Sequence, residues 1–325
     1  PSHAYHTYMI GYLRLILNVD VHAGNETASS HTAPGLWALL DRLGRDRWPT
    51  LLRGDAGFGN EAIMHEAERR NLHYLFKLRL TANVKRALKK TMNQSGWTDA
   101  GQGWEGAKSS LRLTGWSRSR QVIMLRRRLE NVAAMTTSHE SKQALLGFVD
   151  VLPGREMYEY AVLVSSLDEE VQTFGQLYRD RADCENNFDE LKNQWGWGGF
   201  TTHDLKRCQI MSRSVALVYN WWNIFVRMVE PDRHMEAITS RPLLMHAIAA
   251  KISHAGQTTI RIASQHAKAP WAAAALSKVA AFLRALIDNA EQLTNPEKWC
   301  RMLSYAFQKY LKGRQLDPPL QLAAT

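Results

Sequence analysis

Apolar and polar residues follow one another along the first 90 residues in patterns that predict strands and helices in turn. Residues 5–21 predict two strands that turn near Gly11, and residues 30–43 predict a helix. An amphipathic helix is expected at 60–70, and a further strand at 73–78. This succession of short elements is typical of an α/β fold.

The pattern changes at about residue 91. Short segments rich in Trp, Ser, Thr and Arg then continue to residue 167, with turn residues between them, and predict a small β-rich region. Most of the chain beyond it has apolar residues at helical spacing; Pro231 ends one long helix, and more helices are expected at 248–262, 270–286 and 296–310. We therefore divide the chain into four sections: 1–90, 91–167, 168–230 and 231–325.

Residues 176–197, QLYRDRADCENNFDELKNQWGW, have the composition and spacing of a single helix. At 100° per residue, four of its polar residues lie within an arc of roughly 60°, so we expect them on one face: Tyr178, Arg181, Glu185 and Lys192. The structural alternative is a solvated ion pair between Arg181 and Glu185, which stabilises a helix by only a few tenths of a kcal/mol. The spacing alone does not separate an active-site wall from this alternative.

An aspartate stands at the end of the apolar run that precedes the helix at 60–70. Asp55 follows Arg53 and Gly54, and glycines at 57 and 59 break the pattern after it. Open α/β sheets bind ligands at the carboxyl ends of their strands, so Asp55 and Glu185 could meet there to hold hard divalent cations. The alternative for Asp55 is an ordinary turn residue ahead of glycine-rich sequence.

The charge of the chain suits a polyanionic partner. Its formal net charge is +10 and its sequence pI is about 9.6, although charge alone does not separate DNA from RNA or an anionic membrane. The densest basic cluster lies in the β-rich region and suits phosphate contacts, with a solvated strand face as the alternative for each member: Arg118, Arg120, Arg126, Arg127 and Arg128.

Cysteine, histidine and hydropathy patterns narrow the class of protein. The three cysteines are odd in number and far apart, and the twelve histidines show no metal-ligand spacing, so neither a disulfide framework nor a zinc site is expected. We expect no apolar run of transmembrane length, since polar residues interrupt 215–229, and no signal peptide is visible. We therefore expect a soluble, cytoplasmic protein, with no membrane partner, that binds metal through carboxylates.

The spacing Tyr-x2-Arg-x3-Glu-x6-Lys from Tyr178 to Lys192 resembles the signature of a large superfamily of bacterial insertion-sequence transposases of the DDE type. In that superfamily the second catalytic aspartate lies in an Arg-x-Asp-x-Gly-Phe context, which this chain reproduces at Arg53, Asp55, Gly57 and Phe58. The resemblance therefore covers two motifs that are far apart in the sequence.

This resemblance implies a ribonuclease-H-like catalytic core, interrupted by a β-rich insertion and followed by a helical carboxyl-terminal region. It implies metal-dependent cleavage at transposon ends and strand transfer into target DNA, with two Mg²⁺ ions, or Mn²⁺ in their place, held by Asp55 and Glu185. Tyr178, Arg181 and Lys192 would then hold the backbone of the transposon end. One insertion tryptophan would accept a flipped base: Trp97, Trp104 or Trp116.

The partners that the resemblance implies are double-stranded DNA, as terminal inverted repeats and as target, and a second protomer in a homodimer assembled on DNA. The first catalytic aspartate of the superfamily lies upstream of the segment that opens this sequence. We therefore expect an amino-terminally truncated chain that cleaves poorly by itself, with Asp20 as the alternative ligand. Two other functions stay open: an inactive or domesticated remnant that only binds DNA, and a ribonuclease-H-like nuclease acting on RNA or a hybrid.

Overall fold

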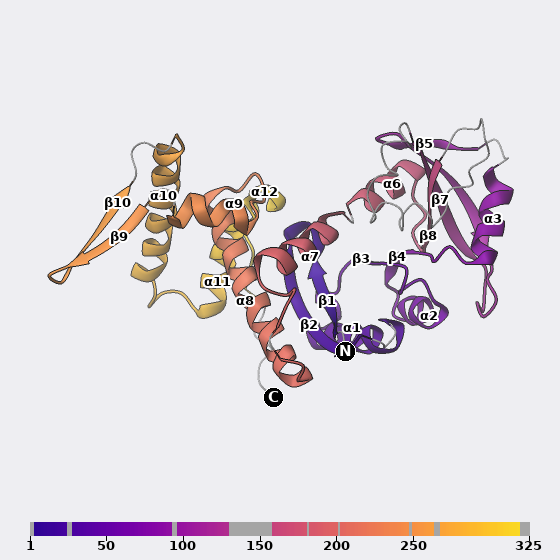
Figure 1. The fold of residues 1–325 in the computed structure, drawn as a ribbon, viewed down its shortest axis with the longest axis horizontal. Helices are drawn as coiled ribbons and strands as arrows, with labels where there is room; N and C mark the ends of the chain where they lie inside the picture. Colours follow the sequence, from indigo (N-terminus) through magenta and orange to yellow (C-terminus); the bar gives the residue numbers. More distant parts are fainter. Residues whose placement is uncertain are drawn as a thin grey trace. The chain divides into compact units, whose positions relative to one another are not determined.

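The computed structural model describes residues 3–24, 28–92, 96–129, 158–180, 182–200, 202–246, 249–262 and 267–318. The chain divides into two compact units (Figure 1). The first unit comprises residues 1–6 and 20–184, and the second comprises residues 7–19 and 185–325. Each unit is a separate body with its own core.

The amino-terminal segment is a hairpin, as the pattern predicts. Strand β1 (His3–Ile10) and strand β2 (Leu15–Ala23) are joined by the 3-10 turn η1 (Gly11–Leu13) and form a two-stranded sheet. Arg14 follows the turn in the left-handed region, with φ of 53°. The open end of the hairpin belongs to the first unit and its closed end to the second.

A six-stranded mixed sheet forms the centre of the first unit. Its strand order is β3-β4-β8-β7-β6-β5, with β3 and β4 parallel and the other neighbours antiparallel. In the described part of the predicted β-rich region, residues 96–129 and 158–167, the strands are confirmed. Because β8 pairs with β4, they extend the sheet that carries Asp55. The strands are β3 (Leu51–Gly54), β4 (His73–Lys77), β5 (Thr98–Gly101), β6 (Trp104–Leu111), β7 (Arg120–Arg128) and β8 (Tyr158–Ser165).

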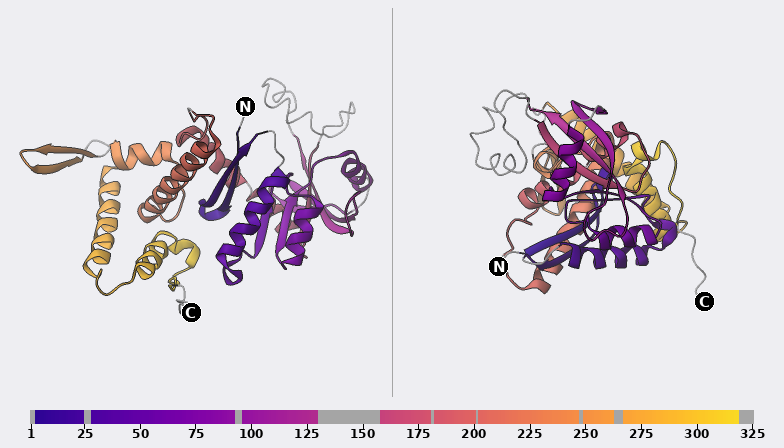
Figure 2. Two further views of the ribbon diagram at one scale, coloured as in Figure 1. Left: turned by 90° about the horizontal axis from the view of Figure 1, so that it is seen from below. Right: turned by 90° about the vertical axis from the view of Figure 1, so that its right-hand side faces the viewer.

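Alternating apolar residues give this sheet two buried faces. One face packs against α1 (Ala28–Leu43), α2 (Glu61–Arg69) and α3 (Ala82–Met92), and α6 (Val171–Arg179) packs against the other (Figure 2). Phe76 and Met124 belong to the first core, whereas their neighbours Leu75 and Leu125 belong to the second. The helices predicted at 30–43 and 60–70 are thus confirmed.

Helices form most of the second unit. They are α7 (Ala182–Gln194, in this unit from Glu185 on), α8 (Leu205–Val229), α9 (Ala237–Arg241), the π-helical turn η3 (Pro242–His246), α10 (Ala269–Asp288), α11 (Asn295–Ala306) and α12 (Gln308–Leu311). The helices expected at 270–286 and 296–310 are confirmed, the latter as α11 followed by α12.

The helix predicted at 248–262 is wrong. This segment is an antiparallel hairpin of β9 (Ala249–His254) and β10 (Gln257–Ile262). Ala255 and Gly256 have φ of 50° and 77°, the pair of positive values that a tight two-residue turn requires. This turn outweighs the helical spacing of the apolar residues.

Two asparagines of α8 hold the closed end of the amino-terminal hairpin in the second unit. Asn220 binds both backbone polar groups of Ile16, accepting from its N–H at 2.9 Å and donating to its carbonyl at 2.8 Å. Asn223 donates to the carbonyls of Leu13 and Arg14 at 2.8 and 3.0 Å. Side-chain amides thereby satisfy backbone groups that a neighbouring strand would otherwise pair.

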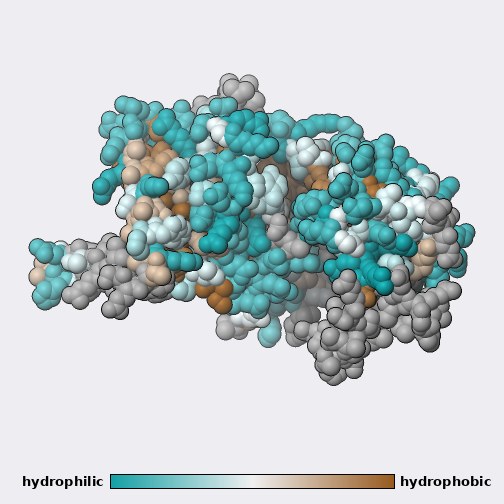
Figure 3. Space-filling model, turned by 90° about the horizontal axis from the view of Figure 1, so that it is seen from above, coloured by the Kyte–Doolittle hydropathy of each residue, from teal (hydrophilic) through white to brown (hydrophobic). Residues whose placement is uncertain are grey.

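Among the described residues, α10 is the one helix whose length and composition would allow it to cross a membrane. The expectation that no segment has these properties is therefore wrong for α10. Its residues Ala269, Ala272 and Val279 pack in the core of the second unit. Figure 3 shows hydrophobic residues gathered on part of one face of the molecule.

A buried arginine joins α2 to the sheet in the first unit. The side chain of Arg120, at the start of β7, is 2% exposed and donates to Glu61 at 2.6 Å and to Glu68 at 2.8 Å. Tyr74 also donates to Glu68, at 2.8 Å. The ring of Trp116 lies 5.4 Å from the guanidinium. Arg120 thus connects two turns of α2 with the centre of the sheet.

Removal of this guanidinium should destabilise the first unit strongly. Arg120→Ala leaves two glutamates without their partner, and breaking such a buried ion pair typically costs about 3–5 kcal/mol. Arg127→Ala, on the same strand, is the matched control, because Arg127 and Glu159 are both nearly half exposed. Loss of this exposed pair should lower the free energy of unfolding by about 1 kcal/mol or less. Urea unfolding, with hydrogen exchange to assign the change to β7, measures both. Equal losses would contradict the structural role of Arg120.

Acid should weaken the same unit. The hydrogen bond from Arg120 lowers the pKa of Glu61 to about 2. Burial raises the pKa of Glu68, but bonds from Arg120, Arg118 and Tyr74 outweigh it and bring that pKa to about 2 as well. Their stabilisation is complete above the ordinary pKa of 4.5 and is lost as pH falls toward 2. Melting temperatures from pH 6 to 2.5 should show this fall, and a Glu61→Gln, Glu68→Gln variant should show a shallower one; parallel curves would refute it.

Candidate functional site

Asp55 lies in a tight turn at the carboxyl end of β3. Its Oδ1 accepts the N–H of Gly57 at 2.8 Å, and Asn60 donates to the carbonyl of Gly57 at 2.9 Å. The residue is exposed. Asp55 is therefore a turn residue, which was the alternative interpretation of its sequence context. It is also an accessible carboxylate at an edge of the sheet.

The residues around Asp55 explain why the motif has its composition. A Cβ on Gly54 would lie 2.6 Å from the ring of Phe58, so only glycine lets Phe58 fold back over the strand end. Phe58 packs in turn against Phe76 of β4, with ring centroids 5.9 Å apart. The Arg-x-Asp-x-Gly-Phe pattern thus encodes one compact turn that presents Asp55.

Arg53 connects this turn to α6. Its Nη1 donates to the carbonyl of Leu177 at 3.2 Å, one residue before Tyr178. The Tyr178 ring packs edge-on against Trp104 with centroids 5.4 Å apart, and the Nζ of Lys77 lies 6.0 Å from the Tyr178 centroid. The first unit therefore brings the Asp55 turn and the first residue of the second motif to one place.

Sequence reasoning missed Lys77 at this place. Gly54 pairs with Phe76 in the parallel register of β3 and β4, so Asp55 and Lys77 follow at the same edge of the sheet. Lys77 could have been identified from its place at the end of β4, the strand that pairs with the strand preceding Asp55. A half-buried ammonium here is suited to a phosphate.

The single helix predicted through residues 178 to 192 is wrong. α6 ends at Arg179 and α7 begins at Ala182; Arg181 lies outside the described residues. Arg179 donates to the carbonyls of Ala100 and Gly101 at 2.6 and 2.9 Å, and Asp180 accepts from Gln176. These contacts fix the end of α6 on β5 and outweigh helix propensity.

The other two motif residues lie on α7. Glu185 and Lys192 are both exposed, and seven residues place them on the same face, about two turns apart. Glu190, between them, is buried instead: His234 lies 2.9 Å from one of its oxygens and the N–H of Ala237 donates to the other at 3.0 Å. Although burial alone would raise it, the pKa of Glu190 is lowered, chiefly by His234.

Carboxylates are the donors that hard divalent cations prefer, and Asp55 and Glu185 meet that chemical requirement. They belong to different units. The described part of the chain contains no group of three His, Cys, Asp or Glu side chains that could hold a metal ion. Asp20, the alternative ligand, lies half-buried on β2. The suitability of Asp55 and Glu185 for a divalent cation therefore rests on the chemistry of their carboxylates.

The arginines of the β-rich region are largely paired with acids. Arg118 is 61% exposed and lies 2.9 Å from Glu68, and Arg126 donates to Glu105 at 2.6 Å. The guanidinium of Arg120 is buried and ends on Glu61 and Glu68. The prediction that Arg120 contacts DNA is therefore wrong, because the glutamates of α2 neutralise it in the interior.

Two of the three candidate tryptophans are also buried. Trp104 and Trp116 are 6% and 7% exposed. The prediction that Trp116 contacts DNA is therefore wrong, since its ring packs in the core beside Arg120. Trp97 is half-buried, with the Arg126 guanidinium 4.2 Å from its centroid. Of the three, Trp97 is the most accessible.

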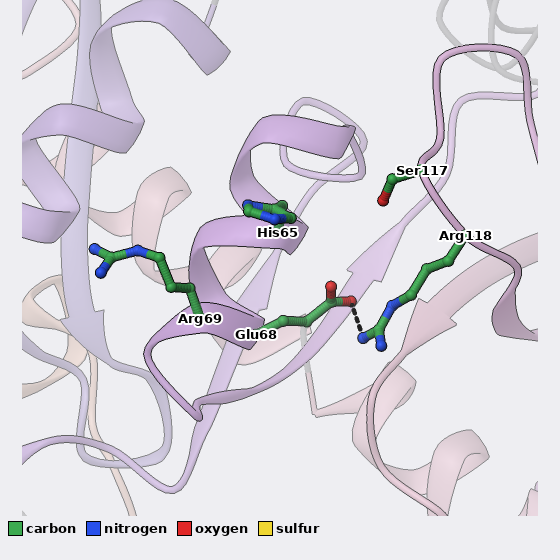
Figure 4. A pocket seen from close by; sticks show the side chains of 5 residues that line it. All are labelled: His65, Glu68, Arg69, Ser117 and Arg118. Carbon is green, nitrogen blue, oxygen red and sulfur yellow. Dashed lines mark ion pairs between the residues drawn. The ribbon is translucent and has the colours of Figure 1, made fainter.

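A polar pocket lies between α2 and the segment before β7 (Figure 4). Its volume is about 360 Å³, and Glu68 pairs with Arg118 across it. Neither Asp55 nor Tyr178 lines it. The lining residues are His65, Glu68, Arg69, Ser117 and Arg118.

Comparison with known protein families gives one finding that bears on this geometry. The family model described as "Transposase DDE domain" matches residues 9–221. The match covers both motifs, from β3 through α7. A comparison with curated proteins gave no match.

The position of Tyr178 should depend on a glycine of α6. A Cβ on Gly175 would overlap the carbonyl oxygen of Ala100 and lie 2.9 Å from its Cβ. Although Gly→Ala within a helix ordinarily stabilises by up to about 1 kcal/mol, Gly175→Ala should destabilise by a few kcal/mol. Thermal unfolding compares it with Gly199→Ala, where a Cβ meets nothing within 4 Å. An unchanged or raised melting temperature for Gly175→Ala would contradict the packing of α6 on β5.

Proposed function

We propose, because this chain belongs to the transposase DDE domain family, that it catalyses metal-dependent cleavage of DNA at the ends of a transposable element and strand transfer into target DNA. One observation carries the proposal. In the first unit Arg53 holds the Asp55 turn against the end of α6, beside Tyr178. The Asp55 turn and the first residue of the second motif are thereby linked within the first unit.

The proposed reaction is two phosphoryl transfers on DNA. In the first, water attacks the phosphorus at the element end; the bond to the 3′ oxygen breaks and leaves a 3′-hydroxyl and a 5′-phosphate. In the second, that 3′-hydroxyl attacks a phosphorus in target DNA, and the target's own 3′ oxygen leaves. Each step forms one P–O bond and breaks one.

Asp55 and Glu185 would hold two divalent cations, Mg²⁺ or Mn²⁺. When bound, such ions supply activation of the attacking oxygen and charge stabilisation of the leaving oxygen. The turn around Asp55 contributes by fixing its carboxylate: Gly57 donates to one oxygen, which restricts the rotation of the side chain. Glu185 contributes an exposed carboxylate from a helix anchored through Glu190.

Tyr178, Arg181 and Lys192 would position the DNA backbone near the reacting phosphate. The Tyr178 ring packs edge-on against Trp104, and the side chain would contact DNA from this position. An arginine can bind a phosphate in a bidentate manner, whereas Lys192 supplies a point charge. Arg118 and Arg126 would offer hydrogen-bond donors to phosphate oxygens, while Glu68 and Glu105 balance much of their charge.

Joining two element ends to one target requires that both ends be held together. We extend the proposal to a homodimer assembled on DNA, in which each protomer holds one end. A closed two-fold pair is the commonest arrangement of identical chains.

Loss of either carboxylate should abolish cleavage without abolishing binding. Asp55→Asn and Glu185→Gln keep the shape of the side chains but remove the negative charge that a cation requires, so cleavage should fall by at least about a thousandfold. Cleavage is measured with full-length protein, including any residues that precede Pro1, on duplexes carrying the element ends under Mg²⁺ and Mn²⁺.

Asp189→Asn is the matched control, since Asp189 is an exposed carboxylate of the same helix α7 outside the motif. It should cleave like the unchanged chain. Binding of element ends without nicking, in the unchanged chain and under either metal, would refute the catalytic proposal and favour a remnant that only binds DNA. A metal-dependent preference for RNA would favour a ribonuclease-H-like nuclease.

A further inference from the structure

The segment from Ala237 to Ile287 contains no acidic residue, although 31 Asp and Glu residues are spread over the chain. These 51 residues carry six cations: Arg241, Lys251, Arg261, Lys268, Lys278 and Arg284. In the first unit, by contrast, arginines of the β-rich region end on glutamates. The segment includes the hairpin of β9 and β10. Its charge pattern suits a polyanion more closely than the sequence's arginine cluster does.

The β9–β10 hairpin extends away from the helices of its own unit (Figures 1 and 2). Its strands pair from Ala249 with Ile262 to His254 with Gln257. Ser253, His254, Gln257 and Thr259 are exposed near its tip. In Figure 3 the tip, at the left-hand end, is mostly hydrophilic.

An isolated two-stranded hairpin is marginally stable in water and presents two unpaired edges. A docking partner that covers these edges would stabilise it. Because the exposed tip consists of uncharged hydrogen-bonding side chains, that partner must present polar groups. Membrane hydrocarbon does not meet this condition.

The dimensions of the hairpin match a groove of duplex DNA. Six-residue strands span about 20 Å, and two strands lie about 4.8 Å apart. The major groove is about 12 Å wide and admits a two-stranded ribbon. Gln pairs with adenine in that groove, and Ser and Thr bond to several base edges.

We propose that the β9–β10 hairpin is an arm that enters a groove of double-stranded DNA. Its tip residues contact base edges, and the cations nearer its base, Lys251 and Arg261, contribute attraction to phosphates. The inference rests on the proposed function and adds to it a DNA contact far along the sequence from Asp55 and Glu185. A second copy of the chain fits the hairpin less well, because a self-paired interface would place two acid-free segments against each other.

The first test measures how much the two cations of the hairpin contribute to DNA binding. The full chain, without metal, binds a fluorescent 40-base-pair duplex of mixed sequence at 50 to 300 mM KCl. Lys251→Ala, Arg261→Ala should weaken binding and reduce the slope of log affinity against log salt by about 1.8, because each phosphate contact contributes about 0.9. Circular dichroism and the melting temperature confirm that the variant is folded.

The matched control removes two exposed cations from elsewhere in the same unit, Lys312→Ala, Arg314→Ala. It should change the slope by clearly less. Equal changes in the two variants would overturn the arm, because attraction would then be spread over the surface. A loss of self-association with unchanged DNA affinity would overturn it in favour of a second copy of the chain.

A second variant tests groove contact without changing packing or formal charge. His254→Ala, Gln257→Ala should keep the salt slope and lose protection of a short stretch of the duplex in hydroxyl-radical footprints. An unchanged footprint overturns the arm. DNA binding by the unchanged chain, with both hairpin variants behaving like it, would leave the proposed function standing and remove only the arm. Absence of binding to any duplex would remove both.

Discussion

The contact between α6 and the edge of the large sheet is the constraint on which the candidate site depends. Gly175 allows the helix to approach Ala100 closely, and Arg179 fixes its end through two carbonyls of β5. Arg53 joins the same helix to the strand that presents Asp55. The backbone of Tyr178 is therefore held by contacts of the residues on both sides of it. A local change in any of these contacts would alter the geometry of the site without touching a motif residue.

The elements of the first unit could be predicted from the sequence because local patterns and tertiary structure agree there. The β3–α2–β4 succession is encoded by an apolar run, a glycine-rich turn and an asparagine cap whose side chain accepts from Ile63. The hairpin of β9 and β10 could not be predicted in this way. Its turn depends on the positive φ of Ala255, a residue that rarely adopts it, so the sequence carried only part of the signal.

The candidate site could be predicted in its residue types but not in its connections. Asp55 is recognisable from its place after a strand, and the spacing of Tyr178, Glu185 and Lys192 marks them as a set. Their placement on two helices depends on the bonds of Arg179 to a strand nearly 80 residues away, which periodicity does not contain. For the same reason Lys77 was overlooked: its relation to Asp55 arises from strand register. Among the residues predicted to contact DNA, Arg120 and Trp116 are buried, which the sequence pattern alone did not indicate.

The inward position of Arg120 changes where the long-range field of this protein originates. Arg118, Arg120, Arg126 and Arg127 each end on a glutamate, so the charge of these four arginines is largely balanced locally. A potential that extends beyond the Debye length of about 8 Å must come from an excess of one sign of charge. The segment from Ala237 to Ile287 has such an excess, with six cations and no acidic residue. Under the proposed function, this segment of the second unit would attract DNA, and Asp55 and Tyr178 of the first unit would act on a phosphate that is already bound.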